Sequence, residues 1–145
     1  MTLTWWSLIR FVHVLAAIVW VGGQLTLSLV VLPVLRTDLA PEVRAPVIHK
    51  AARRYALIAN VAVLPLSLIT GIALAWHRGV TFGIFDDPGY GRLLSIKLLL
   101  VVASIVLAAA HGIVATRSPA RARPLALSGL AASVGIVVFA TALVP

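Results

Sequence analysis

Cysteine is absent from the 145 residues, and acidic residues number only four against twelve lysines and arginines. The lack of cysteine excludes a disulfide framework and a thiolate metal site. The shortage of acidic residues gives a formal net charge of +8, a value also found in nucleic-acid-binding proteins. Here, however, the basic residues flank long apolar runs, as membrane topology requires. We therefore expect no nucleic-acid partner.

Apolar residues make up 61% of the chain and the mean hydropathy is +1.09, whereas an average soluble domain is roughly 45–50% apolar. Four apolar runs approach or exceed the ~20 residues that a helix needs to cross about 30 Å of hydrocarbon. The first run lacks a basic leader and a convincing cleavage site, which predicts a retained span. We place the four spans at residues 6–34, 55–76, 93–116 and 125–144.

These runs predict an all-α fold, an integral membrane four-helix bundle in which residues 1–145 form a single domain with short connections. Short loops rich in lysine and arginine stay on the cytoplasmic side of a membrane. Eight such residues lie between spans 1 and 2 or between spans 3 and 4, and three (Arg10, Arg78 and Arg92) lie in the other flanks. Both termini are therefore predicted to face outside.

Polar side chains within the apolar runs are informative, because each is costly in lipid unless it faces the bundle interior and finds a partner. Span 1 carries His13, Trp20 and Gln24 at steps of seven and four residues, which keep them on one helical face. Beside them, Gly22 and Gly23 remove side-chain bulk where another backbone approaches. We expect a functional role for His13 and helix packing for the other four.

A second polar stripe lies in span 3, where Lys97, Ser104 and His111 recur every seven residues. In span 2, Asn60, Ser67 and Gly71 also fall on one face of a regular helix. We expect Ser104 and Asn60 to pack helices. Lys97 and His111 are candidate binding residues, because ionisable groups within a membrane mark functional sites.

Depth along the helices divides the candidates into two sites. Spans 1 and 3 run in the same direction, so His13 and Lys97 both lie within roughly 6–11 Å of the outer boundary, and His111 lies about 21 Å further along. One metal ion cannot easily bind both His13 and His111, because ligand atoms lie only ~2 Å from a metal. The sequence allows an outer site from His13, Lys97 and His77 and an inner site from His111 and His49.

Three stretches resemble the membrane domain of the CopD family of copper-resistance proteins: FVHVLAAIVWVGGQL, RRYALIANVAVLPLSLITGIAL and YGRLLSIKLLLVVASIVLAAAHGIVATR. The segment from Tyr90 to Leu94, followed by Lys97, is the most specific part. This resemblance covers most of the chain and leaves span 4 out. It implies a multi-pass protein of the bacterial plasma (inner) membrane that binds copper or transports it across the membrane, with a periplasmic or extracellular metal carrier as partner.

The HemJ-type protoporphyrinogen oxidases, four-helix membrane proteins that bind haem b, have a similar layout. The resemblance lies in a histidine ahead of a tryptophan in span 1, paired arginines before span 2, and lysine and histidine in span 3. It matches His13 and Lys97 to the functional histidine and lysine of that family, and implies a haem-b oxidoreductase acting on a porphyrinogen or quinol. Copper(I) prefers sulfur ligands, whereas imidazole suits copper(II) or haem iron. The sequence is therefore compatible with either copper or haem b as the cofactor.

A third hypothesis is a small membrane scaffold or accessory subunit, in which the polar stripes only pack helices. The sequence does not decide whether the chain is an enzyme. Its expected partners are the lipid bilayer and, in a homo-oligomer, a second copy of the chain. Cofactor binding is predicted for His13, Lys97 and His111, and direct metal ligation for His13 and His77.

Overall fold

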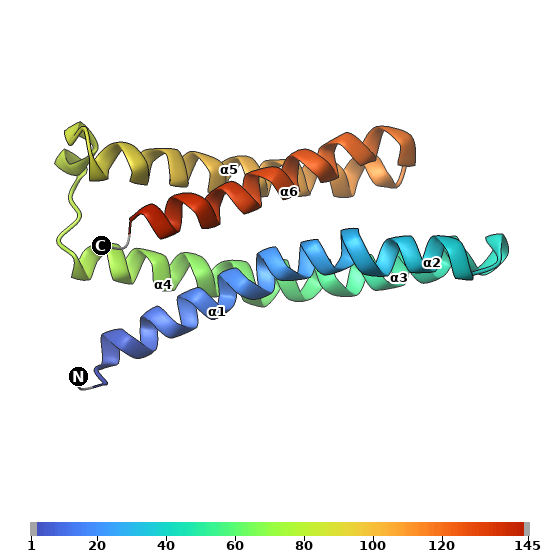
Figure 1. Cartoon of the computed structure of the whole chain (residues 1–145), viewed down its shortest axis with the longest axis horizontal. Coiled ribbons are helices and arrows are strands. Elements are labelled where there is room, and N and C mark those ends of the chain that lie inside the picture. Colours follow the sequence, from blue (N-terminus) through green and yellow to red (C-terminus); the bar gives the residue numbers. More distant parts are fainter. Residues whose placement is uncertain (1–2, 144–145) are drawn as a thin grey trace. The chain divides into compact units, whose positions relative to one another are not determined.

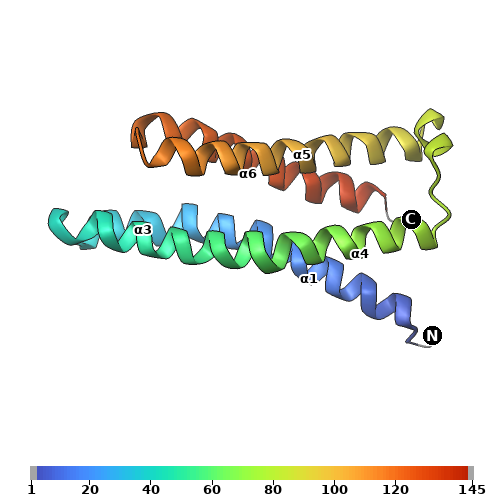
Figure 2. The ribbon, with the colours of Figure 1, turned by 180° about the vertical axis from the view of Figure 1, so that it is seen from behind.

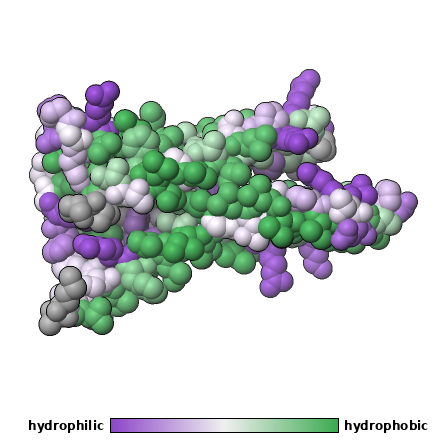
Figure 3. Space-filling view, viewed as in Figure 1, coloured by the Kyte–Doolittle hydropathy of each residue, from purple (hydrophilic) through white to green (hydrophobic). Residues whose placement is uncertain are grey.

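The computed structural model describes residues 3–143, and the regular elements within that range are helices. Four helical runs are long and apolar enough to cross a membrane, which confirms the predicted all-α membrane fold. The chain divides into two units, one up to Gly79 and one from Val80 onward, and each is described by itself. Figures 1 and 2 show that each unit is a pair of helices lying side by side. Apolar side chains cover the middle of the helices, and hydrophilic ones gather toward their ends (Figure 3).

The first unit is a helical hairpin in which each arm contains a short π-helical segment. The arms consist of α1 (Trp5–Thr26), the π-helix η1 (Leu27–Val31) and α2 (Leu32–Asp38), followed by α3 (Pro41–Ile58), the π-helix η2 (Ala59–Val63) and α4 (Leu64–His77).

Local signals set the ends of this hairpin. Thr4 and Ser7 form a capping box that satisfies free backbone N–H groups at the start of α1. Between the arms, the Arg44 side chain donates two hydrogen bonds to the Leu39 carbonyl, at 2.9 and 3.2 Å, and so ties the turn to α3. After α4, Gly79 adopts a φ of +69°, a left-handed conformation that glycine allows at a helix C-terminus.

Both π-helical segments come shortly before a proline, η1 before Pro33 and η2 before Pro65. Proline has no N–H group, so the regular i to i−4 hydrogen-bond ladder is interrupted at its position. At η2 the turn is wider, and the Leu64 N–H donates to the Ala59 carbonyl five residues earlier. Such a turn changes which residues share a helical face on either side of it.

The helices of the first unit extend beyond the predicted spans. Span 1 was predicted to end at residue 34 and span 2 to begin at residue 55, but the helical runs are Trp5–Asp38 and Pro41–His77. Their 34 and 37 residues correspond to about 51 and 55 Å at 1.5 Å per residue. Hydropathy reports where a helix leaves lipid, whereas the helix itself continues through the basic segment. The connection between the two runs is therefore a tight turn.

Small and β-branched side chains form the contact between the arms. Ala16 and Val21 of α1 are buried, as are Ala59 and Val63 of η2. Alanine at this contact lets the two backbones approach closely, which is how helices associate where lipid supplies no hydrophobic driving force between them.

The second unit contains the 3-10 helix η3 (Phe82–Asp86), α5 (Tyr90–Ala115) and α6 (Pro119–Ala142). Helix α5 begins three residues before the predicted span 93–116 and ends one residue before its end. Helix α6 begins six residues before the predicted span 125–144, whose residue 144 lies outside the described residues. A Cβ atom at Gly91 would overlap the Ile84 carbonyl group, so only glycine lets η3 pack on the first turn of α5. This contact explains the glycine in the segment from Tyr90 to Leu94.

Helices α5 and α6 pack through a small-residue surface on α6. A Cβ atom at Gly135 would lie 3.1 Å from Leu100, and one at Gly129 would lie 3.6 Å from Leu107. The leucines of α5 therefore fit against glycines of α6, as in other closely packed membrane helices.

Candidate metal site around His13

The imidazole of His13 is half-buried against α4. Its Nδ1 atom lies 3.0 Å from the Ser67 carbonyl oxygen and 3.0 Å from the Thr70 hydroxyl oxygen. A carbonyl oxygen can only accept a hydrogen bond, so Nδ1 carries the hydrogen and donates it. In the neutral ring the other nitrogen, Nε2, is then the one with the lone pair, which is the atom that a metal ion requires.

The ring also depends on a glycine in α4. A Cβ atom at Gly71 would lie 3.0 Å from Cε1 of His13, the ring carbon between the two nitrogens. Ser67, Thr70 and Gly71 thus form the surface against which the imidazole rests, and we call these three residues the His13 seat. No role was predicted for Thr70 from the sequence. Its position could have indicated one, because Thr70 follows Ser67 by three residues and therefore lies on the same helical face.

The outer candidate His77 lies at the end of the hairpin where α1 begins and α4 ends. Its ring stacks on Trp6 with a centroid distance of 3.7 Å and an angle of 6° between the planes. Trp5 and Trp76 are exposed at the same end, an arrangement typical of a membrane interface. His13 is seven residues after Trp6, so it lies about 10 Å along the helix axis from this end. That separation is too long for His13 and His77 to share one metal ion.

Within residues 3–143, no three histidine, cysteine, aspartate or glutamate side chains cluster closely enough to hold a metal ion. Lys97 is half-buried on α5 of the second unit. Its expected pairing with His13 stays a prediction.

Further along the first unit, Tyr55 of α3 meets the polar face of α1. Its hydroxyl donates a 2.6 Å hydrogen bond to the Trp20 carbonyl and also hydrogen-bonds with Gln24. Gly23 leaves room for the Tyr55 ring, since a Cβ atom there would overlap it, whereas one at Gly22 would meet no atom within 4 Å. This contact of Tyr55 was not predicted, because a tyrosine next to paired arginines is common at a membrane boundary.

Asn60 does not join the seat of His13. Its side chain is exposed and donates to the Ala56 carbonyl of its own helix, at 2.8 Å. The predicted common face with Ser67 assumed a regular helix, but Asn60 lies within the π-helical turn η2 (Ala59–Val63), which rotates it relative to Ser67.

In the second unit, two residues of the predicted polar stripe, Ser104 and His111, form hydrogen bonds with α6. Ser104 and Ser133 are buried and their hydroxyls are 2.8 Å apart, and the Nδ1 atom of His111 lies 2.9 Å from the Ala122 carbonyl oxygen. His111 therefore also donates through Nδ1 to the neighbouring helix. His49, which was grouped with His111, is exposed on α3 of the first unit, and the inner site stays a prediction.

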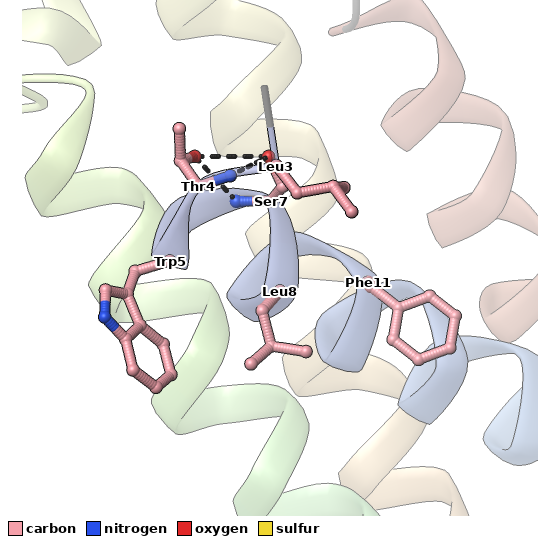
Figure 4. Close-up of a pocket in the computed structure, with 6 residues that line it drawn as sticks. All are labelled: Leu3, Thr4, Trp5, Ser7, Leu8 and Phe11. Atoms are coloured by element: carbon pink, nitrogen blue, oxygen red, sulfur yellow. Dashed lines mark hydrogen bonds between the residues drawn. The ribbon is translucent and has the colours of Figure 1, made fainter. Parts of the chain in front are cut away.

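A depression of about 530 Å³ at the start of α1 contains none of the predicted binding residues. Figure 4 shows Trp5, Leu8 and Phe11 around it, below the hydrogen-bonded Thr4 and Ser7. The lining residues are Leu3, the N-cap Thr4 and four residues from the first turns of α1, and most are exposed. The feature is an open apolar groove without groups that could bind a metal ion.

Comparison with known proteins gives one family match: residues 49–144 match the model of CopD, copper resistance protein D. The match includes span 4, which the sequence resemblance left out, and it does not include residues 1–48 with His13. An uncharacterized protein of Aquifex aeolicus (strain VF5) is 38% identical over 66 residues, which are 46% of this chain and 45% of that protein. The chain thus covers less than half the length of that relative. No solved structure matches the chain significantly.

Proposed function

Because the chain belongs to the CopD family, copper resistance protein D, we propose that it handles copper as its cargo, binding the ion within the membrane and passing it between the two faces. The observation that carries this proposal is the seat of His13. The ring donates Nδ1–H to the Ser67 carbonyl, and metal-binding histidines almost always donate their second nitrogen in this way. Nε2 is then the coordinating atom.

The donor set favours passage over storage. His13 contributes one imidazole, and the described residues do not gather three metal-binding side chains around it or elsewhere. A copper ion held by one protein ligand keeps coordination positions for ligands brought by a carrier or by water, and it can leave readily. Imidazole is a suitable ligand for copper(II). His77, about 10 Å nearer the end of the hairpin, is the histidine that copper would meet first on the outer side.

Haem b is the second candidate cofactor, and the same hydrogen bond favours it. An axial histidine of haem also coordinates through one ring nitrogen, and its second-shell hydrogen bond tunes the iron. In that case His13 would bind the haem iron, and Lys97 would supply positive charge to a propionate. The bound haem would supply electron transfer for oxidation of a porphyrinogen or quinol.

Copper titration into purified protein in detergent tests the primary proposal. We expect wild-type protein to bind copper(II), and His13→Ala to lose that binding while still inserting as a helical protein, because span 1 stays apolar. The matched control is His49→Ala, which removes an exposed imidazole on α3 and is expected to keep wild-type affinity. Equal copper affinity in wild type and His13→Ala would overturn the proposal.

Transport is tested with proteoliposomes that enclose a copper-quenched dye. Wild-type and His49→Ala vesicles are expected to quench after copper addition, and His13→Ala vesicles to quench at the rate of protein-free vesicles. If His13→Ala binds no copper but still transports it, copper passes by a route that avoids His13.

A further inference from the structure

The seat of His13 contains a second acceptor, the hydroxyl of Thr70. This side chain is buried, and its oxygen lies 2.6 Å from the Leu66 carbonyl, 3.2 Å from the Ser67 carbonyl and 3.0 Å from Nδ1 of His13. A threonine hydroxyl has one hydrogen to donate and two lone pairs that accept. Both backbone carbonyls are acceptors, so the hydroxyl hydrogen points to one of them.

The hydrogen bond that the Thr70 hydroxyl donates determines which atom donates in the bond between Thr70 and His13. With its hydrogen committed to a carbonyl of α4, the Thr70 oxygen can only accept from His13. The Ser67 carbonyl imposes the same requirement on the same nitrogen. Two independent acceptors therefore hold the hydrogen on Nδ1.

Gly71 adds a steric condition to these two bonds. A Cβ atom at this position would lie 3.0 Å from Cε1 of His13, closer than ordinary carbon contacts of about 3.5–4.0 Å. With alanine at this position, the ring would have to move by a few tenths of an ångström, and we expect that shift to weaken its hydrogen bonds to α4. At Gly22 of α1, by contrast, the same added atom meets nothing within 4 Å.

We propose that Thr70 and Gly71 are positioning residues that fix His13 in its Nδ1–H tautomer, and so make Nε2 the ring nitrogen that binds the ion. This inference rests on the proposed copper function for its consequence, but the tautomer itself belongs to the metal-free protein. Thr70 acts by accepting from the ring, and Gly71 by allowing the ring to reach that acceptor.

The tautomer is measured by nitrogen NMR on metal-free protein labelled with ¹⁵N-histidine, with His13→Ala identifying the signals of His13. At a pH where the ring is neutral, we expect Nδ1 protonated and Nε2 unprotonated. Thr70→Val should increase the population with hydrogen on Nε2, and Thr70→Ser should restore the wild-type spectrum. Gly22→Ala is the matched control: its added Cβ meets no atom within 4 Å and should leave the His13 signals unchanged.

The consequence for copper is measured by equilibrium dialysis with copper(II) alone. Loss of a second-shell partner typically lowers metal affinity about 10–100-fold, so we expect that loss in Thr70→Val and Gly71→Ala. Thr70→Ser and Gly22→Ala should stay within about twofold of wild type, because neither substitution removes a hydrogen-bond partner of Nδ1.

The two experiments separate the inference from the function on which it rests. A wild-type tautomer in both Thr70→Val and Gly71→Ala would overturn the inference, whatever copper does. If the tautomer shifts in these variants but the wild-type protein binds no copper, Thr70 and Gly71 do position His13, and the copper function is contradicted. Unchanged copper affinity in Thr70→Val despite a shifted tautomer would overturn the claim that Nε2 is selected for metal binding.

Discussion

His13 of α1 donates its Nδ1 hydrogen to the Ser67 carbonyl oxygen of α4 across 3.0 Å. One bond thus links the candidate metal ligand to the packing of the helical hairpin. Because the acceptor belongs to the backbone, no side chain at position 67 is needed for it. A ligand held in this way keeps its orientation only while α1 and α4 stay in contact.

The first prediction concerns Gly23, where a Cβ atom would overlap the Tyr55 ring. Gly23→Ala is expected to lower the free energy of unfolding in detergent by about 1–3 kcal/mol, the usual cost of overpacking. Gly22→Ala is the matched control, because an added Cβ there meets open space. Thermal unfolding followed by circular dichroism measures both. Equal stability of the two variants would contradict the Tyr55 contact.

The second prediction concerns the buried serine pair of the second unit, whose hydroxyls are 2.8 Å apart. A double-mutant cycle with Ser104→Ala and Ser133→Ala should give a coupling energy of about 0.6 kcal/mol, the average for such bonds in membrane proteins. Unfolding titrations of the wild type, both single variants and the double variant provide the four values. Strictly additive single effects would show that the two hydroxyls do not interact.

The four spans were predictable because hydropathy and length report burial in lipid directly, and the structure gives four helical runs that satisfy both criteria. The ends of the first two runs were not predictable in the same way. Residues 41–54 are polar, so they ended the apolar pattern, yet they form the start of α3. Leaving lipid and ending a helix are different physical events, and hydropathy reports only the first.

The candidate site was predictable in part. His13 stood out because an imidazole in an apolar run is costly, but its acceptors did not. Ser67 contributes a backbone carbonyl, which every residue has, and Thr70 is common in apolar helices because its hydroxyl bonds within its own helix. The exposed position of Asn60 was not predictable, because the π-helical turn η2 that contains it leaves little trace in the sequence beyond the following Pro65.

The third prediction concerns Gly91, where a Cβ atom would overlap the Ile84 carbonyl. Gly91→Ala should release η3 from the first turn of α5 and increase the rate of limited proteolysis within residues 80–89 severalfold, because cleavage requires local opening. Gly112→Ala is the control within the same helix, since its added Cβ meets nothing within 4 Å. Identical cleavage rates for wild type and Gly91→Ala would rule out this packing role.

The fourth prediction concerns orientation and follows from the eight basic residues in two segments against three in the others. A reporter that is active only in the cytoplasm should be active when inserted near Glu42 and silent when fused after Pro145. The opposite pattern would reverse the orientation and exchange the outer and inner ends of the hairpin.

The most direct test of the copper account is the cofactor content of protein purified from cells supplied with both copper and haem. Metal analysis and the visible absorption spectrum are recorded on wild type, His13→Ala and His49→Ala. The account predicts copper in wild type and His49→Ala, its loss in His13→Ala, and no Soret band in any of them. A Soret band with b-type bands on reduction, lost in His13→Ala, would replace copper by haem b, and copper content unaffected by His13→Ala would contradict the role of His13.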